Sequence, residues 1–179
     1  MSVEFPRPLR LERIGAAGLD ITVTAGPAEC ETLAARMNLP AIASLSCRFR
    51  LRPGPAGCIE ARGNLTAKIT QLCVISLDAF PAELTEAFEI RFVPDGTEAE
   101  EPDPDSPDEI PHDGEAIDLG EATAEQLALA LDPYPRKPGA ELPPEATPPG
   151  ENPFVRLASL PLAPPPLAPP PLASTKRKN

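Results

Sequence analysis

The chain has 179 residues, of which 27 are proline, and more than half of these prolines fall between Pro133 and the C-terminus. Proline lacks an amide N–H and fixes φ, so that last part cannot form helices or inner strands, and we expect one modest domain before it. The net charge is −11, but residues 1–92 are neutral, and residues 93–125 hold thirteen acids and no Lys or Arg. An anionic partner is therefore not excluded for the first half of the chain.

The cysteines show neither a metal-binding nor a disulfide pattern. They are Cys30, Cys47, Cys58 and Cys73. None of them forms a CxxC or CxH pair. Basic residues interrupt the start of the chain, so we expect no apolar segment of a secretory signal there. No run of residues approaches the ~20 apolar residues of a membrane span. We therefore expect reduced thiols, a cytoplasmic location, no membrane segment, and no metal or other cofactor.

The first elements are a strand and a helix. Residues 9–14 alternate apolar and polar side chains, which predicts a short extended segment, and residues 19–25 repeat that pattern with more β-branched residues. Gly26-Pro27 then predicts a helix start, because proline is well tolerated at the first helical position. The apolar face of this helix consists of Cys30, Leu33, Ala34 and Met37.

A long β-hairpin follows. Residues 45–52 and 58–69 alternate apolar and polar side chains on either side of a turn at 53–57. Residues 84–93 should add a further strand. A sheet with a single apolar face needs a cover, which the helix at 27–37 can supply. The predicted fold class is α+β: an antiparallel sheet, made of the long hairpin plus further strands, covered by one or two helices.

The second half of the chain contains an acidic segment, another helix and a tail. Residues about 94–116 are rich in Asp, Glu and Pro, so we predict a mobile, disordered acidic loop inside the domain. Structure should resume at Asp118-Leu-Gly-Glu121, whose capping-box spacing opens a helix over 119–131. The domain is expected to span residues 1–137. Residues 138–179 should form a disordered, low-complexity, Pro-rich tail with a polyproline II repeat.

The sequence contains no catalytic constellation. Its single histidine, His112, falls in the predicted acidic loop and is interpreted as a solvated side chain, whereas general acid–base catalysis needs a positioned group. Cys73 has no indicated base beside it, so a buried core cysteine is the simpler interpretation. The acidic segment lacks the ligand spacing of a calcium loop. We expect no enzyme activity, no catalytic or metal-binding residues and no small-molecule substrate.

The polar side of the hairpin carries a row of arginines. Arg48, Arg50 and Arg52 should lie about 6.5–7 Å apart along one side of a strand, which is close to the phosphate repeat of a nucleic-acid strand. No aromatic residue is interleaved, so phosphate contacts are expected without base stacking or sequence readout. Alternatively, the arginines are only solvated and pair with Glu60 or Glu89. The candidate RNA-binding residues are Arg48, Arg50, Arg52, Arg62, Lys68, Arg136 and Lys137.

The segment from Ile117 to Pro138 resembles the C-terminal motif of the YceD family, whose members are bacterial proteins linked to accumulation of large-subunit ribosomal RNA. Residues 33–36, 69–77 and 88–92 and the Glu151-Asn-Pro-Phe-Val155 stretch also agree with the family. The motif residues in this chain are Cys73, Asp118, Leu119, Gly120, Glu121, Gln126, Pro133, Tyr134 and Pro135. Many members carry a Cys-x-x-Cys pair where this chain has Thr70 and Cys73, so no thiol-pair role is carried over.

The resemblance implies a non-catalytic factor in synthesis, processing or stability of large-subunit, 23S-type ribosomal RNA, which supports large ribosomal subunit biogenesis. The implied partners are that RNA or a pre-ribosomal particle, and ribosomal proteins or assembly factors are further candidates. The alternative function is a protein–protein adaptor that acts through the acidic loop and the Pro-rich tail without direct RNA contact.

Overall fold

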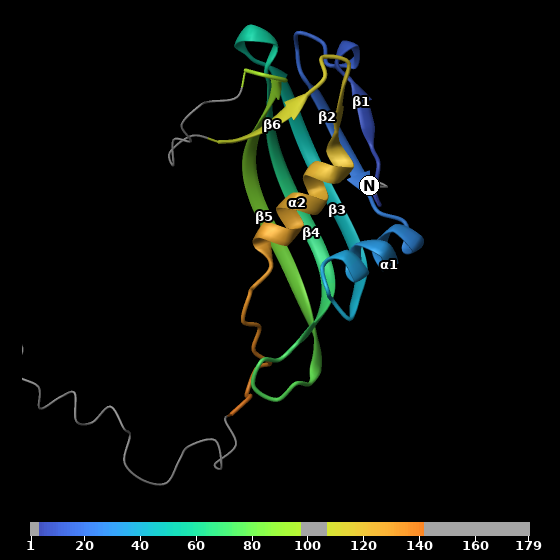
Figure 1. Cartoon of the computed structure of the whole chain (residues 1–179), viewed down its shortest axis with the longest axis vertical. Coiled ribbons are helices and arrows are strands. Elements are labelled where there is room, and N and C mark those ends of the chain that lie inside the picture. The colour runs from blue at the N-terminus through green and yellow to red at the C-terminus, as the bar shows by residue number, and fades with distance from the viewer. Residues whose placement is uncertain (1–3, 98–106, 142–179) are drawn as a thin grey trace, which may run out of the picture. The chain divides into compact units, whose positions relative to one another are not determined.

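The computed structural model describes residues 4–97 and 107–141. A five-stranded sheet with the order β2-β3-β4-β5-β6 lies beside a two-stranded sheet formed by β1 and β7 (Figure 1). The strands are β1 (Pro8–Arg10), β2 (Leu19–Thr24), β3 (Ala41–Pro53), β4 (Ile59–Leu72), β5 (Ala79–Pro94), β6 (Asp108–His112) and β7 (Ala116–Asp118). The helices are α1 (Pro27–Arg36) and α2 (Leu119–Ala130), with single 3-10 turns at Leu11–Arg13 and Pro55–Gly57. This architecture confirms the α+β class.

The predicted hairpin is present and longer than expected. β3 and β4 pair antiparallel from Ala41–Thr70 to Pro53–Ile59 across the short turn. β5 begins at Ala79, earlier than the predicted start, and pairs with β4 along the whole length of β4. Among the described strands, the first part of β5 has only β4 as a neighbour, because β6 pairs with β5 only from Ile90 onward. Pro81 is therefore tolerated in this part, since an edge strand does not need every amide N–H.

The prediction of a mobile loop over residues 94–116 is wrong for much of its described part. Asp108–His112 forms β6, which pairs parallel with β5, so the sheet is mixed and not antiparallel as predicted. Ala116 begins β7, which pairs antiparallel with β1. Composition alone favoured disorder, but Ile110 and Ile117 supply inward-facing apolar groups to these strands. Residues 98–106 and the predicted tail from residue 142 onward lie outside the described residues.

His112 is a second correction in the same segment. The histidine was interpreted as a solvated loop residue, but it ends β6 and only 6% of it is exposed. Its Nδ1 accepts a hydrogen bond from the backbone N–H of Gly114 at 3.0 Å. The side chain is therefore both buried and positioned.

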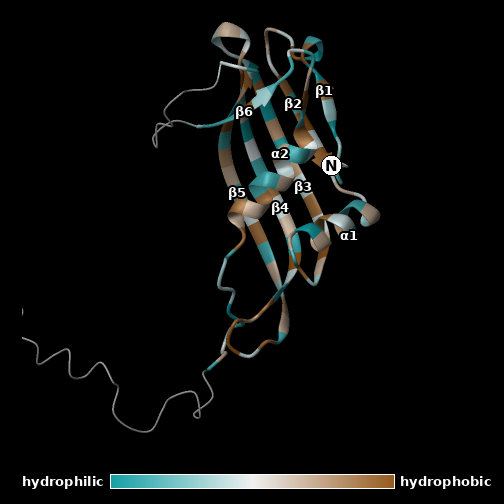
Figure 2. Cartoon of the chain, in the orientation of Figure 1, coloured by the Kyte–Doolittle hydropathy of each residue, from teal (hydrophilic) through white to brown (hydrophobic). Residues whose placement is uncertain are grey.

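The core lies between one face of the large sheet and the two helices. Apolar and polar bands alternate along β3, β4 and β5 in Figure 2, as the period-two pattern requires. α1 packs on β3, whereas α2 contacts β4, β5 and β1. Side chains with no exposed surface meet here from sheet and helices: Leu33, Leu45, Phe49, Leu65 and Leu127. Neither helix of the described part is long or apolar enough to cross a membrane.

Asp118 is the N-cap of α2 and joins that helix to the N-terminal segment. Its Oδ1 accepts hydrogen bonds from the backbone N–H groups of Gly120 at 2.8 Å, Glu121 at 3.1 Å and Arg7 at 2.9 Å. The predicted helix start is confirmed, and the third donor adds a contact 111 residues away in sequence.

Replacing the cap should measurably destabilise the domain. We expect Asp118→Ala to lower the free energy of unfolding by about 1–2 kcal/mol, because it removes a cap and leaves backbone donors unpaired. Asp118→Asn keeps an acceptor oxygen and should lose much less. Urea unfolding of both variants tests this, and equal stability of Asp118→Ala and the parent protein would contradict the cap.

Candidate nucleic-acid interface

The sheet face opposite the helices is polar and open. Its side chains come from alternating positions of the strands, beginning with the exposed residues Arg48 and Arg50 on β3 and Arg62 on β4. We call the basic part of this surface the arginine face. Its members are Arg48, Arg50, Arg52, Arg62 and Lys68.

The strand register determines how the two basic rows face each other. Arg50 lies directly opposite Arg62, and Arg52 lies opposite Glu60. The arginines of β3 therefore share a face with Arg62. Like charges at directly opposed positions are unfavourable. The Arg50–Arg62 pair thus needs an anion near it, supplied either by the protein or by a ligand.

Carboxylates of neighbouring strands supply some of this negative charge. Arg50 Nε lies 3.3 Å from Asp20 Oδ1, and Arg48 Nη2 lies 3.5 Å from Asp20 Oδ2. Arg62 Nε lies 3.1 Å from Glu89 Oε1. These basic side chains are 59–71% exposed, so each ion pair contributes about 0–1 kcal/mol to stability. Another anion can therefore replace the carboxylate in each pair.

The remaining basic side chains of this face are Lys68 and Arg52. Lys68 Nζ pairs with Glu83 at 3.2 Å, while Arg52 makes no ion pair with any described residue. Of the two acids expected from the sequence as partners, Glu89 forms an ion pair, whereas Glu60 forms none with any described residue. The ion-pair partners Asp20 and Glu83 were missed. Finding them required the register of β2 and β5, which local alternation does not give.

Two surface pockets lie between these side chains. Their volumes are about 130 and 190 Å³, and Arg50 and Arg62 line both. Arg52 and Glu60 complete the first, and Arg48 and Asn64 the second. Each volume is several times the roughly 30 Å³ of a water molecule. An oxyanion therefore fits between guanidinium groups whose bonding geometry matches phosphate.

Sequence reasoning missed Arg91 as a member of this surface. Arg91 of β5 stands opposite Glu60 of β4, on the same face, and its guanidinium pairs with Glu109 of β6 at 3.2 Å. Its position could have been found from the alternation in residues 84–93, once that strand was known to pair with β4.

Arg136 and Lys137 do not lie beside the arginines of the face. The backbone N–H of Val74 donates to the carbonyl oxygen of Pro135 at 2.9 Å, and Lys137 Nζ pairs with Asp78 at 3.2 Å. This segment thus contacts the turn that follows β4, whereas Arg62 lies near the start of β4. At about 3.3 Å per residue, the two places are roughly 30 Å apart along the strand.

The same turn contains the motif cysteine. Cys73 is buried, and its Sγ accepts a hydrogen bond from the backbone N–H of Ser76 at 3.5 Å. This bond, together with one from the backbone N–H of Lys137, lowers the pKa of the Cys73 thiol to about 7. The Pro133-Tyr-Pro135 segment therefore holds the end of α2 against the Cys73 turn, with Tyr134 itself exposed.

The other motif residues build α2 and its contacts. Leu119 and Gln126 are buried, and Gly120 lies against the backbone of Phe5. Glu121 pairs with Arg36 of α1 at 2.7 Å, and this hydrogen bond contributes most to the raised pKa of Arg36. The motif is thus structural: its residues fix α2 and the segments at its two ends. Among the described residues, no three His, Cys, Asp or Glu side chains gather as metal ligands.

These features define an α+β domain whose sheet has one face covered by helices and one open face rich in arginine. The family model for the large ribosomal RNA subunit accumulation protein YceD matches residues 61–154, more than half of the chain. The chain belongs to this family, whose name associates it with accumulation of large-subunit ribosomal RNA. The match includes Arg62 and Lys68, whereas β3 precedes it. No curated protein and no solved structure matches the chain.

Proposed function

We propose that this chain is a non-catalytic cytoplasmic factor in the synthesis, processing or stability of large-subunit ribosomal RNA. It supports large-subunit biogenesis by binding that RNA, or an assembly intermediate that contains it, on the arginine face. The carrying observation is the opposed Arg50–Arg62 pair, which is exposed and held only by weak surface ion pairs. Family membership supports the choice of RNA as the anion.

The chemistry of the face favours phosphate contacts over base reading. Arginine binds phosphate through two parallel N–H···O bonds, and a phosphate that replaces Asp20 or Glu89 removes the repulsion between Arg50 and Arg62. Side chains at alternating positions of β3 and β4 follow the spacing of successive phosphates. None of the described residues of this face is aromatic, so stacking on bases contributes nothing.

The expected affinity is modest. The five bases of the arginine face and the neighbouring Arg91 stand beside five acids, Asp20, Glu60, Glu83, Glu89 and Glu109. Long-range attraction is therefore weak, and binding depends on direct guanidinium–phosphate bonds. Dissociation constants in the non-specific range of about 10⁻⁴ to 10⁻⁶ M are expected at physiological salt.

Loss of the protein should change the balance of ribosomal subunits. In a strain lacking it, sedimentation profiles should show a reduced ratio of large to small subunits and less large-subunit RNA. The parent protein should restore the ratio, and Arg48/Arg50/Arg52→Gln should not. A normal ratio in the deletion strain contradicts the proposed process. Full restoration by the triple variant favours the adaptor alternative, in which RNA is reached only through a protein partner.

A further inference from the structure

The basic part of the open sheet face is narrow. In the antiparallel register of β3 and β4, its arginines occupy three successive cross-strand pairs: Arg52–Glu60, Arg50–Arg62 and Arg48–Asn64. Neighbouring strands lie about 4.8 Å apart, so the guanidinium groups form a strip that is only two strands wide. The arginine face therefore presents its positive charge along the strands and not across them.

Carboxylates flank this strip on both sides. On β2, Asp20 lies opposite Arg50. On β5, Glu89 lies opposite Arg62, and the only basic residue of this strand, Arg91, pairs with a carboxylate of β6 at 3.2 Å. A polyanion above the sheet thus meets arginine over β3 and β4, and carboxylate about one strand spacing, roughly 5 Å, to either side.

The two pockets of the face follow one another along the strip. Arg50 and Arg62 line both pockets, and Arg52 extends one of them while Arg48 extends the other. The pockets therefore lie on either side of the Arg50–Arg62 pair, about 6.8 Å apart, because successive pairs on one face are two residues apart along a strand. This step suits successive phosphates of an extended sugar–phosphate strand. A diphosphate cannot fill both pockets, because its two phosphorus atoms share a bridging oxygen and lie much closer together.

Hydrogen-bonding side chains continue the strip beyond the arginines. The next pairs toward the start of β3 place three hydroxyl groups and a final ammonium group on the same face: Ser46–Thr66 and Ser44–Lys68. The five cross-strand pairs extend over roughly 27 Å. That length accommodates about four to five phosphates at the same step of ~6.8 Å.

We infer that the arginine face binds one unpaired RNA strand, which runs along β3 and β4. The inference rests on the proposed function and specifies the form of the RNA. Successive phosphates occupy the two pockets, and the bases point away from the sheet, because none of the described side chains of this face is aromatic. A duplex fits poorly, because proteins bind it through both strands across a wide minor groove. Its second strand would lie over Asp20 or Glu89.

General electrostatic attraction predicts the opposite preference. A duplex carries more phosphates per unit length than a single strand, and each phosphate contact on it releases more counterions. A basic patch that acted only through its charge would therefore bind duplex RNA more tightly. A preference for the single strand thus distinguishes the arrangement of the bases and acids on this face from their overall charge.

Calorimetry on the full chain measures this preference directly. The probe is an RNA strand of about ten nucleotides that cannot pair with itself, and its control is the same strand annealed to its complement. The dissociation constant of the duplex should be about three- to tenfold higher, because each carboxylate under the second strand costs about as much as a surface ion pair. Oligouridylates of increasing length should gain affinity steeply up to about five nucleotides and only slightly beyond.

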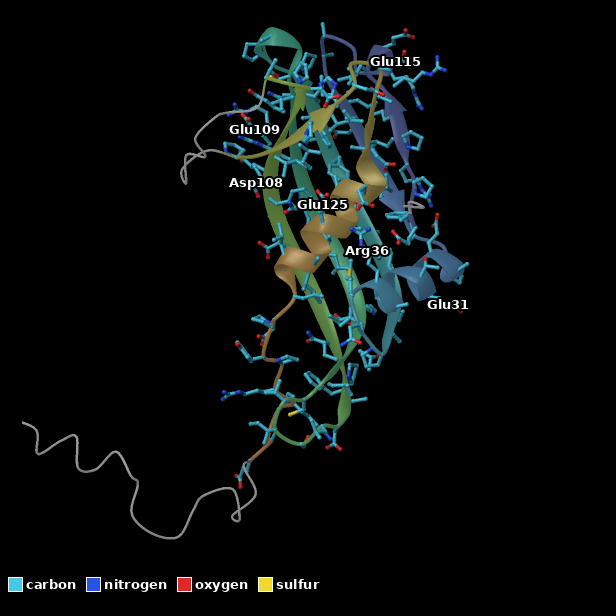
Figure 3. The ribbon with its side chains drawn as sticks, viewed as in Figure 1. Glu31, Arg36, Asp108, Glu109, Glu115 and Glu125 are labelled. Carbon is cyan, nitrogen blue, oxygen red and sulfur yellow. The ribbon has the colours of Figure 1, made fainter. Side chains whose placement is uncertain are left out.

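Two double variants with matched charge changes test the role of the flanking acids. Asp20→Asn/Glu89→Gln removes the carboxylates beside the strip, so duplex binding should tighten more than single-strand binding and the ratio of the two dissociation constants should fall. Glu31→Gln/Glu115→Gln removes two exposed carboxylates, on α1 and just before β7 (Figure 3). Both lie outside the five-stranded sheet, so this control should leave the ratio unchanged.

The outcomes separate this inference from the proposed function. Equal or tighter binding of the duplex, with both RNAs weakened by Arg48/Arg50/Arg52→Gln, overturns the single-strand inference and leaves RNA binding by the arginine face intact. A ratio that changes equally in both double variants, or in neither, also overturns the inference, because the flanking acids would then not determine the preference. Failure of both RNAs to bind contradicts the proposed function, and the inference with it.

Discussion

Gly120→Ala should lower the free energy of unfolding by about 3 kcal/mol, at the upper end of the overpacking range. Helix propensity alone predicts the opposite sign, because alanine is about 1 kcal/mol better than glycine inside a helix. The difference lies in packing. A Cβ on Gly120 would overlap the carbonyl oxygen of Phe5 and lie 2.9 Å from its carbonyl carbon. Both atoms belong to the backbone, so no rotamer change can relieve the overlap.

The N-terminal segment is held too firmly to move away. The backbone N–H of Leu119 donates to the carbonyl oxygen of Arg7 at 3.2 Å, and the Arg7 N–H donates to Asp118 at 2.9 Å. Phe5 is completely buried in the core. A shift of the segment would therefore break hydrogen bonds or disturb the core, which is why the larger packing term should exceed the propensity term.

Urea unfolding of two alanine variants checks this expectation. Gly15→Ala is the matched control, because nothing lies within 4 Å of the added methyl group at this exposed position. It should be neutral or slightly stabilising, since alanine restricts the unfolded chain. Equal stability of Gly120→Ala and Gly15→Ala would mean that the N-terminal segment does not lie against α2 as described.

Local patterns predicted the hairpin but not the strand at its far edge. Alternation with period two placed Leu45, Phe49 and Leu65 on the buried face, and all three are fully buried. β6 could not be found in this way, because two of its five residues are acidic and a third is Pro111. Its pairing with β5 and the burial of His112 depend on tertiary contacts, which outweigh local composition.

The positions of the candidate interface residues were predictable within a single strand but not between strands. Alternation placed Arg48, Arg50 and Arg52 on one side of β3, and the structure agrees. Arg50 lies opposite Arg62 because of the register in which β3 pairs with β4. The apolar faces of the two strands specify that register only once it is known that these strands pair. The separation of Lys137 from this face depends on a tertiary hydrogen bond between Val74 and Pro135, which no periodicity indicates.

Arg48/Arg50/Arg52→Gln should reduce the affinity for large-subunit rRNA fragments and its salt dependence together. Each phosphate contact releases counterions, so the logarithm of the binding constant falls with the logarithm of salt concentration in proportion to the contacts. Removing three contacts should flatten this slope by roughly two to three units. The preference among RNA sequences should barely change, because these residues contact phosphates and not bases.

The control removes arginines elsewhere. Arg10 and Arg13 are exposed and lie outside the five-stranded sheet, on β1 and in the following 3-10 turn. Arg10/Arg13→Gln changes the net charge in the same direction and should leave the slope within one unit of the parent value. Both variants should unfold at the parent urea concentration, because all five side chains are exposed.

The slope of RNA binding against salt, measured for the parent chain and these two variants, tests the central claim most directly. The account predicts a steep slope for the parent, a clearly flatter one for Arg48/Arg50/Arg52→Gln, and little change for Arg10/Arg13→Gln. The same affinity and slope in the triple variant as in the parent would contradict it, and the arginine face would then be only a solvated surface.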